Sequence, residues 1–313
     1  MTKTAFLYAG QGSQFAGMGK DLYEEYPAFR SLLDRLDPGF DAKQMMFEDP
    51  RGLLSDTRYT QPCMALFAMG VTQVLKENGI EPQAAAGLSL GEYGALYAAG
   101  VFDEETCCRL VTYRGKVMAE AAEKYSCAMS AVLGLSAQQL EQCCRTAEEK
   151  GFVCVANYNC PGQYVISGEE PAVAAAEEAA RAMGARRCVR LAVSAPFHTP
   201  FLKEAGERLG EFLQPVRLQT PRIPVALNVT GSFYKEGQYL KALLKQQVSS
   251  SVRFEDCLQA LLQSGVDRFI EIGPGDALSG FCRRKAKEMG ILCSVVTLQN
   301  ADDLDRLLNE QEK

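Results

Sequence analysis

The chain has 313 residues, of which 47% are apolar and 23% charged, the composition of a globular protein large enough to bury a sizeable core. The net charge of −6 argues against a nucleic-acid-binding protein, because no strong basic field is present overall. The apolar run at residues 4–9 is too short for a signal-peptide core or a membrane span, so we expect a cytoplasmic protein with no membrane attachment.

Twelve cysteines are many for this length, but their spacing does not indicate a metal site. No CxxC motif occurs and the chain has a single histidine, so a zinc site would need almost only thiolate ligands. We therefore expect free, mostly buried thiols in a reducing compartment and no bound metal.

The first 79 residues predict a strand, a glycine-rich loop and two helical regions. Residues 4–9 are expected to form a short buried strand, which ends in the loop GQGSQ at residues 10–14. This loop either presents backbone N–H groups to an anion or is simply a flexible turn. Helical patterns follow at residues 20–36 and 60–79, separated by a polar stretch at residues 37–59.

Residues 84–100 carry the pattern GxSxG between a short apolar approach and a helical run. In this nucleophile-elbow pattern, Gly87 and Gly91 allow a turn sharp enough to expose Ser89 at the end of a strand. Ser89 then lies at a helix N-terminus, where free N–H groups and the helix dipole favour developing negative charge. The alternative is an ordinary glycine-rich turn whose serine only caps the helix.

The next helix is predicted to run from the N-cap Asp103 to about Lys124, with Arg114 on its apolar stripe between Leu110 and Met118. An arginine on the core-facing side needs an anion, because a buried unpaired guanidinium is very costly. Two partners remain open, namely an internal salt bridge and the carboxylate of a substrate held by two parallel hydrogen bonds.

Residues 126–193 form a separate unit with the predicted order strand, helix, strand, strand, helix, strand. This order is that of the ferredoxin-like split βαβ motif. The chain on both sides alternates strands and helices, as in an α/β protein. We therefore predict a small ferredoxin-like domain at residues 126–193, inserted into a larger α/β domain made of residues 1–125 and 194–313.

The single histidine, His198, follows the last strand of the predicted small domain, at a junction where clefts tend to form. It is the only side chain that can serve as an imidazole base for Ser89. Between the two, the only aspartate is the predicted cap Asp103, so a Ser–Asp–His triad is not evident, although Glu92 closely follows the elbow.

The rest of the chain returns to alternating strands and helices. Strands are expected at residues 222–231 and 291–298, and helices at residues 238–247 and 253–265. Residues 267–275 are expected to form a strand and a glycine-proline turn, followed by a helix to about residue 289. Residues 302–313 are expected to be a charged, frayed end.

Seven motifs follow one another along almost the whole chain: GQGSQ (10–14), TQP (60–62), GLSLGEYGAL (87–96), YRGKVM (113–118), NYNCPGQYVISG (157–168), SAPFH (194–198) and EIGPG (271–275). In order and spacing they resemble the malonyl-CoA:acyl-carrier-protein transacylase family. The resemblance implies a large α/β-hydrolase-like domain with a central, mostly parallel sheet, and an inserted small ferredoxin-like (βαββαβ) domain.

The resemblance also implies roles for individual residues. Ser89 would be the nucleophile and His198 its base, oriented by a backbone carbonyl rather than by a carboxylate. The backbone N–H groups of Gln11 and Leu90 would form the oxyanion hole. Arg114 would clamp the malonyl carboxylate, which supplies the anion that its predicted burial demands.

Further substrate-binding positions follow from the same resemblance. Phe197 resembles the malonyl-selecting form of the histidine motif, and Arg253 occupies a place where relatives carry a polar residue near the histidine. Leu88 is a departure, because relatives usually have histidine there, and it would line the acyl pocket. The remaining cleft residues implied by the motifs are Gln61, Asn159 and Gln163.

The implied reaction is a two-step acyl transfer, in which Ser89 takes malonyl from malonyl-CoA and passes it to the phosphopantetheine thiol of acyl carrier protein. It would supply extender units for fatty acid synthesis and would need no metal or redox cofactor. The alternatives are a discrete polyketide-pathway acyltransferase with a different acyl preference, a serine esterase or hydrolase, and a non-catalytic carrier-binding scaffold. We expect a monomer, since no apolar seam is evident.

Overall fold

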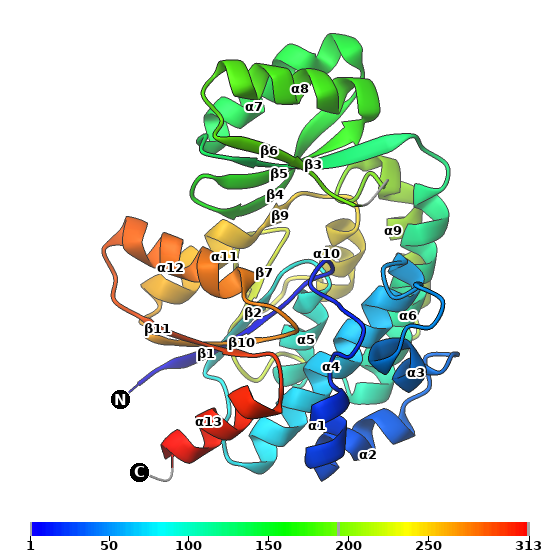
Figure 1. Cartoon of the computed structure of the whole chain (residues 1–313), viewed down its shortest axis with the longest axis vertical. Coiled ribbons are helices and arrows are strands. Elements are labelled where there is room, and N and C mark those ends of the chain that lie inside the picture. The colour runs from blue at the N-terminus through cyan, green and yellow to red at the C-terminus, as the bar shows by residue number, and fades with distance from the viewer. Residues whose placement is uncertain (1, 193–194, 312–313) are drawn as a thin grey trace.

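The computed structural model describes residues 2–192 and 195–311, which form two β-sheets with helices packed against them (Figure 1). The larger sheet has the strand order β11-β10-β1-β2-β7-β8, and its neighbouring strands are parallel except for the β7–β8 pair. Its strands are β1 (Thr4–Tyr8), β2 (Ala84–Gly87), β7 (Val225–Leu227), β8 (Ser232–Phe233), β10 (Arg268–Ile272) and β11 (Ser294–Leu298).

Both faces of the larger sheet are covered, because successive side chains of its strands point to opposite faces. In β1, Phe6 and Tyr8 belong to one apolar core, whereas Ala5 and Leu7 belong to another. On the second side lie α11 (Phe254–Gln263) and α12 (Ala277–Met289). The first core contains residues of α4 (Thr57–Glu77), α5 (Gly91–Ala98), α6 (Glu104–Ala122), α9 (Lys203–Leu213) and α10 (Leu240–Gln247).

The helix predicted over residues 20–36 is two helices, α1 (Lys20–Glu25) and α2 (Pro27–Arg35). Tyr26 between them is extended, because the residue before a proline is disfavoured in helical conformation and proline suits the first position of a new helix. The stretch predicted to be polar loop contains a further short helix, α3 (Ala42–Phe47), whose N-cap Asp41 accepts a hydrogen bond from the backbone of Gln44.

The expectation of a frayed C-terminal end is wrong. Residues Ala301–Gln311 form the helix α13, with Leu304 and Leu307 buried in the main core. The Ala301 N–H donates to an Asp21 carboxylate oxygen at 2.7 Å, which ties the start of this helix to α1. Apolar residues three apart on one face of a charged helix explain why it packs instead of fraying.

The smaller sheet has the order β6-β3-β5-β4-β9 and carries a core of its own (Figure 1). From β3 to β6 the elements follow the predicted order βαββαβ. They are β3 (Cys127–Leu133), α7 (Ala137–Ala147), the 3-10 turn η1 (Glu148–Lys150), β4 (Val153–Cys160), β5 (Gln163–Glu169), α8 (Glu170–Ala182) and β6 (Arg187–Arg190). The extra edge strand β9 (Val252–Arg253) comes from outside residues 126–193 and pairs in parallel with β4. The predicted domain boundaries themselves stay a prediction.

Two further segments differ from the expected elements. The last strand of the predicted small domain, β6, ends at Arg190, before the predicted end of that domain at residue 193, and residues 193–194 lie outside the described residues. A 3-10 turn η2 (Pro200–Leu202) and helix α9 occupy a stretch for which the sequence made no prediction.

The cysteines are free thiols, as predicted, and most of them are buried. Burial raises the pKa of several of these thiols, which keeps them protonated and unreactive. Across the described ranges, none of the helices is long and apolar enough to cross a membrane.

Candidate active site

Ser89 stands on a sharp turn between strand β2 and helix α5, as the GxSxG pattern predicted. Its backbone φ is 53°, a left-handed conformation that a non-glycine residue rarely adopts. The turn is tight because a Cβ on Gly87 would overlap the backbone of Gly91, and a Cβ on Gly91 would overlap the carbonyl oxygen of Tyr8. The local sequence therefore holds the serine hydroxyl at the head of α5.

His198 meets Ser89 across the molecule, with 2.7 Å between the serine Oγ and the histidine Nε2. The other ring nitrogen, Nδ1, lies 3.0 Å from the Gln247 carbonyl oxygen and 3.2 Å from that of Ser250. Because carbonyls only accept hydrogen bonds, Nδ1 carries the proton and Nε2 accepts from the serine hydroxyl. The pair thus has the orientation of a nucleophile and its base, with backbone carbonyls in place of a carboxylate.

The environment of His198 favours its neutral, proton-accepting form. Burial, together with the smaller effect of the nearby positive charge of Arg114, lowers the pKa of the imidazole to about 4. The hydrogen bonds to the two backbone carbonyls act in the opposite direction but do not outweigh burial. At neutral pH the ring is therefore ready to accept a proton.

Arg114 is fully buried in α6 and points at the serine. One terminal nitrogen donates to Gln61 Oε1 at 2.8 Å, and the other donates to Gln247 Oε1 at 3.0 Å and to Ser89 Oγ at 3.2 Å. The guanidinium also lies over the Tyr93 ring, 5.5 Å from its centroid. Within residues 2–192 and 195–311 it forms no ion pair, so the salt-bridge alternative of the sequence analysis is wrong. The cation is held by neutral groups and faces a cavity.

A cavity of about 530 Å³ brings these three side chains together with residues of both sheets. Residues of the smaller sheet, including Met129 and Val165, form part of its wall, opposite the elbow and the loop at residues 10–14. It is therefore a cleft between the two units of the fold. The other predicted site residues that line it are Gln11, Gln61, Leu88, Leu90, Asn159, Gln163 and Phe197.

Arg253 is the one predicted site residue that does not line the cavity. Its guanidinium pairs with Asp256 at 2.6 Å, one turn along the chain, and lies 5.8 Å from the centroid of the Tyr158 ring. Arg253 is therefore an exposed residue of β9 whose side chain binds groups outside the cleft wall.

Gln11 and Leu90 lie on the two segments that border Ser89, but their predicted role concerns backbone N–H groups. In the described part of the chain neither N–H donates to another residue, so both are free to bind an oxyanion. The Gln11 side chain is held away from its backbone by a hydrogen bond to Thr57 Oγ1 at 3.0 Å. The oxyanion hole stays a prediction, with the loop at residues 10–14 placed beside the cleft as it requires.

Sequence reasoning missed Gln247 and Asn228, which hold the elbow from α10 and from the end of β7. The Gln247 amide donates from Nε2 to the Ser89 carbonyl oxygen at 2.9 Å, while its own Oε1 accepts from Arg114. Asn228 binds the backbone on the other side of the serine, at Ser89 N and Gly87 O. Neither residue belongs to a motif, and both are more than a hundred positions from Ser89, so no local signal marked them.

Two buried carboxyl groups complete the surroundings. Glu92, which the sequence analysis noted only as a neighbour of the elbow, accepts the Asn228 N–H, and burial raises its pKa to about 7. Glu271, from the EIGPG motif, lines the cavity and accepts the backbone N–H groups of Leu278 and Ser279 at the start of α12. Burial raises the pKa of this carboxyl as well.

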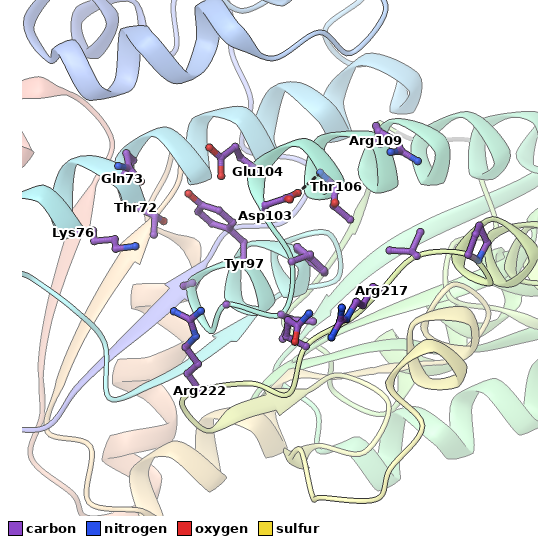
Figure 2. A pocket seen from close by; sticks show the side chains of 17 residues that line it. Thr72, Gln73, Lys76, Tyr97, Asp103, Glu104, Thr106, Arg109, Arg217 and Arg222 are labelled. Atoms are coloured by element: carbon purple, nitrogen blue, oxygen red, sulfur yellow. Dashed lines mark hydrogen bonds between the residues drawn. The ribbon is translucent and has the colours of Figure 1, made fainter.

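A second cavity of about 670 Å³ is larger but lies at the opposite end of α5 (Figure 2). Its wall includes Tyr97 near the C-terminus of that helix, Lys76 of α4, and Arg217 and Arg222 of the segment that follows α9. None of the predicted site residues lines it. The smaller cleft, with its serine, imidazole and guanidinium in contact, is therefore the candidate active site.

Comparisons with known proteins show which proteins this chain resembles. A family model described as "Acyl transferase domain" matches residues 5–307. The malonyl CoA-acyl carrier protein transacylase of Bacillus subtilis (strain 168) is 42% identical over 287 residues, which are 91% of this chain and 90% of that relative.

Two solved structures are similar over nearly the whole fold. The malonyl CoA-acyl carrier protein transacylase from Clostridium perfringens superposes with a TM-score of 0.93 at 36% identity, covering 99% of this chain and 98% of that one. A malonyl-transacylase solved in complex with its type II PKS acyl-carrier protein superposes with a TM-score of 0.92 at 32% identity, covering 99% of this chain and 100% of that one.

Proposed function

This chain belongs to the malonyl CoA-acyl carrier protein transacylase family of acyl transferase domains, and from that membership we propose that it moves a malonyl group from malonyl-CoA to acyl carrier protein. The acceptor is the phosphopantetheine thiol of the carrier, and the product supplies extender units for fatty acid synthesis. The observation that carries the proposal is the contact of one serine with both an imidazole and a buried guanidinium.

In the first step, Ser89 Oγ attacks the thioester carbonyl carbon of malonyl-CoA while Nε2 of His198 takes the hydroxyl proton. The carbonyl oxygen becomes an oxyanion, which the N–H groups of Gln11 and Leu90 stabilise, with the N-terminus of α5 favouring the negative charge. The carbon–sulfur bond then breaks, and coenzyme A leaves with the proton that His198 returns. The malonyl group stays on the serine as an oxyester.

The second step is the reverse of the first with a different thiol. His198 takes the proton of the phosphopantetheine thiol, whose sulfur attacks the malonyl-serine ester. The bond from the acyl carbon to Ser89 Oγ breaks, and His198 returns the proton to the serine. The cleft between the two units of the fold limits the access of water, which would otherwise hydrolyse the ester.

Arg114 gives the site its preference for an acid-bearing acyl group. In a malonyl thioester, one methylene separates the carboxylate from the reacting carbonyl. Because the guanidinium of Arg114 and the hydroxyl of Ser89 are in contact, the carboxylate can bind the first while the carbonyl carbon lies beside the second. A carboxylate accepts two parallel hydrogen bonds from a guanidinium, and burial strengthens the attraction. A simple esterase would leave this buried cation without a use, which favours acyl transfer of malonyl over ester hydrolysis.

The apolar wall of the cleft bears on acyl size. Leu88 and Phe197 line the cavity, and we propose that they pack around the acyl methylene and leave little room for a branch. Gln61, Asn159 and Gln163 would bind the polar parts of the substrate. Asn159 Oδ1 is buried without a hydrogen-bond partner among the described residues, as expected of an atom that awaits a donor.

Three side-chain groups supply the whole chemistry, so we propose that the reaction needs no metal or redox cofactor. The twelve free thiols suit a reducing compartment, which supports a location in the cytoplasm. We also propose that the protein acts as a monomer, since the cleft is built from one chain.

Intact-protein mass spectrometry after brief exposure to malonyl-CoA tests the proposal. We expect a malonyl-sized adduct on the wild-type protein, no adduct on Ser89→Ala, and loss of the adduct when holo acyl carrier protein is added. An adduct that persists on Ser89→Ala, or the absence of an adduct on the wild type, contradicts it. An adduct that water removes as fast as carrier protein does favours the hydrolase alternative.

A further inference from the structure

The backbone of Ser89 is held by an amide side chain that takes no part in the proposed chemistry. Asn228 directly follows strand β7 and is completely buried. Its Nδ2 donates to the carbonyl oxygen of Gly87 at 2.7 Å, and its Oδ1 accepts the N–H of Ser89 at 2.7 Å. One amide group therefore joins the end of β2 to the nucleophile itself.

Asn228 is in turn fixed by its own backbone. Its N–H donates to Glu92 Oε2 at 2.5 Å, and its carbonyl oxygen accepts the N–H of Arg253 at 2.9 Å. Glu92 belongs to α5, the helix that begins directly after the elbow. Contacts with strand β9 and helix α5 thus fix the backbone of Asn228. The side-chain amide cannot rotate without breaking its buried hydrogen bonds to Gly87 and Ser89.

Ser89 needs such support because its φ of 53° is one that L-residues rarely adopt. The amide of Asn228 holds the N–H side of the serine, and Gln247 Nε2 holds its carbonyl side. The next N–H, that of Leu90, donates to no other group in the described part of the chain, and Leu90 lines the cleft. Release of the serine backbone would rotate both the hydroxyl and the Leu90 N–H away from the reacting carbonyl.

We propose that Asn228 is a positioning residue, which fixes the strained conformation of Ser89 from outside the substrate cavity. This inference rests on the proposed function, because it concerns the rate at which Ser89 takes the acyl group. Asn228 is absent from the cavity wall, so it touches no substrate. Its loss should slow acylation and leave the KM for malonyl-CoA almost unchanged.

The variant Asn228→Asp separates the two hydrogen bonds without changing the size of the side chain. An ionised carboxylate still accepts the Ser89 N–H but repels the carbonyl oxygen of Gly87, whereas a protonated carboxyl can donate to that oxygen and accept the N–H. The new carboxyl would be buried beside Glu92 and the thiol of Cys257. Burial raises its pKa, and so does Glu92 at a pH above its own pKa of about 7, where it is ionised. Lowering the pH should therefore restore the wild-type arrangement.

The test is the single-turnover rate of malonyl-serine formation, followed by rapid-quench mass spectrometry between pH 8 and pH 5.5. At pH 8 we expect Asn228→Asp to be slower than wild type by about tenfold to a hundredfold, as for a misplaced nucleophile. The ratio of the Asp variant to wild type should rise at least about fivefold as the pH falls. His198 stays neutral over this range, since its pKa is about 4. Glu92, whose pKa is about 7, gains its proton over the same range in wild type and variant alike, so the ratio of the two rates is compared and not the rates themselves.

Two further variants separate positioning from a general loss of stability. Asn228→Leu cannot form either hydrogen bond, so its rate should be low and its ratio to wild type should not change with pH. Thr72→Val removes a buried side-chain hydrogen bond to Tyr8; neither residue lines the cleft, so the variant should lower Tm without slowing acylation.

The outcomes are distinct. A wild-type protein that takes no malonyl group contradicts the proposed function, whatever the variants do. If the wild type is acylated and Asn228→Asp reacts at the wild-type rate at pH 8, the positioning role is wrong. The role is also wrong if the ratio stays flat with pH and Thr72→Val loses rate in proportion to its loss of Tm.

Discussion

Replacing Arg114 with alanine should change which acyl group the protein accepts, more than whether it can be acylated at all. The guanidinium is fully buried, touches Ser89, and is held in place by Gln61 and Gln247. Arg114→Ala removes the buried positive charge that lies next to the nucleophile. Ser89 and His198 keep their direct contact in this variant, so the ability to attack a thioester should remain.

The size of the effect follows from the hydrogen bonds that a malonyl carboxylate would lose. A hydrogen bond between charged groups contributes roughly 1.5–3 kcal/mol, and a two-pronged contact therefore roughly 3–6 kcal/mol. At about 1.4 kcal/mol per factor of ten, malonyl transfer should fall by roughly a hundredfold to ten-thousandfold. An acetyl group has no carboxylate to lose, so acetyl transfer should change by about tenfold or less.

The assay is kcat/KM for malonyl-CoA and acetyl-CoA with the same carrier protein, in wild type and in two variants. Arg114→Lys serves as the matched control, because it keeps the charge but cannot form the two-pronged contact, and its malonyl activity should lie between the others. An equal fall for malonyl and acetyl substrates in Arg114→Ala would refute the reasoning. Arg114 would then be a structural residue that only holds the two glutamines.

Two further predictions concern the base and the C-terminal helix. Because the pKa of His198 is lowered to about 4, acylation should keep its rate from pH 8 to pH 5 and fall only as the pH approaches 4. A half-maximal rate near pH 6.5 that persists in Glu92→Gln, which removes the group with a pKa of about 7, would contradict this. In the unfolded chain the histidine binds its proton near pH 6.5. The part of the free energy of unfolding that depends on neutral His198 is therefore complete above that pH and is lost as the pH falls toward 4, which a series of Tm measurements against pH would detect. Leu304→Ala should lower the free energy of unfolding by about 2–5 kcal/mol, because it leaves a cavity in the core. Arg306→Ala, on the exposed face of α13, should lower it by almost nothing. Equal small effects of the two variants would mean that this helix does not stabilise the fold.

Short-range patterns predicted the parts of the site that depend on local geometry. The GxSxG spacing placed Ser89 between a strand and a helix, because the close approach of Gly87 to Gly91 is set within five residues. The helical stripe placed Arg114 in the core for the same kind of reason, since burial of one helix face follows from its period.

The partners of these residues could not be predicted in the same way. Gln247 and Asn228 reach the elbow from α10 and from the end of β7, and nothing near them in the chain marks them as polar groups that will be buried. For that reason an internal salt bridge remained open for Arg114, although the folded chain surrounds it with neutral groups.

The misjudged elements have simple physical causes. Pro27 alone indicates that a helix ends before it and another begins, but the helical pattern on either side favoured one continuous helix over residues 20–36. In α13 the many charged residues concealed Leu304 and Leu307, whose spacing was sufficient for one buried face. Strand β9 is two residues long and is defined by its pairing with β4, so it is too short to show the alternation of apolar and polar residues that would predict a strand.

The most direct test of malonyl transfer is to follow both products when the protein, malonyl-CoA and holo acyl carrier protein are mixed. Mass spectrometry of the carrier measures the malonyl thioester, and chromatography of the same sample measures free malonate. The proposed transfer predicts malonyl-carrier as the main product, formed only with both Ser89 and His198 present. Free malonate as the main product, or malonyl-carrier formed equally well by Ser89→Ala, would contradict it.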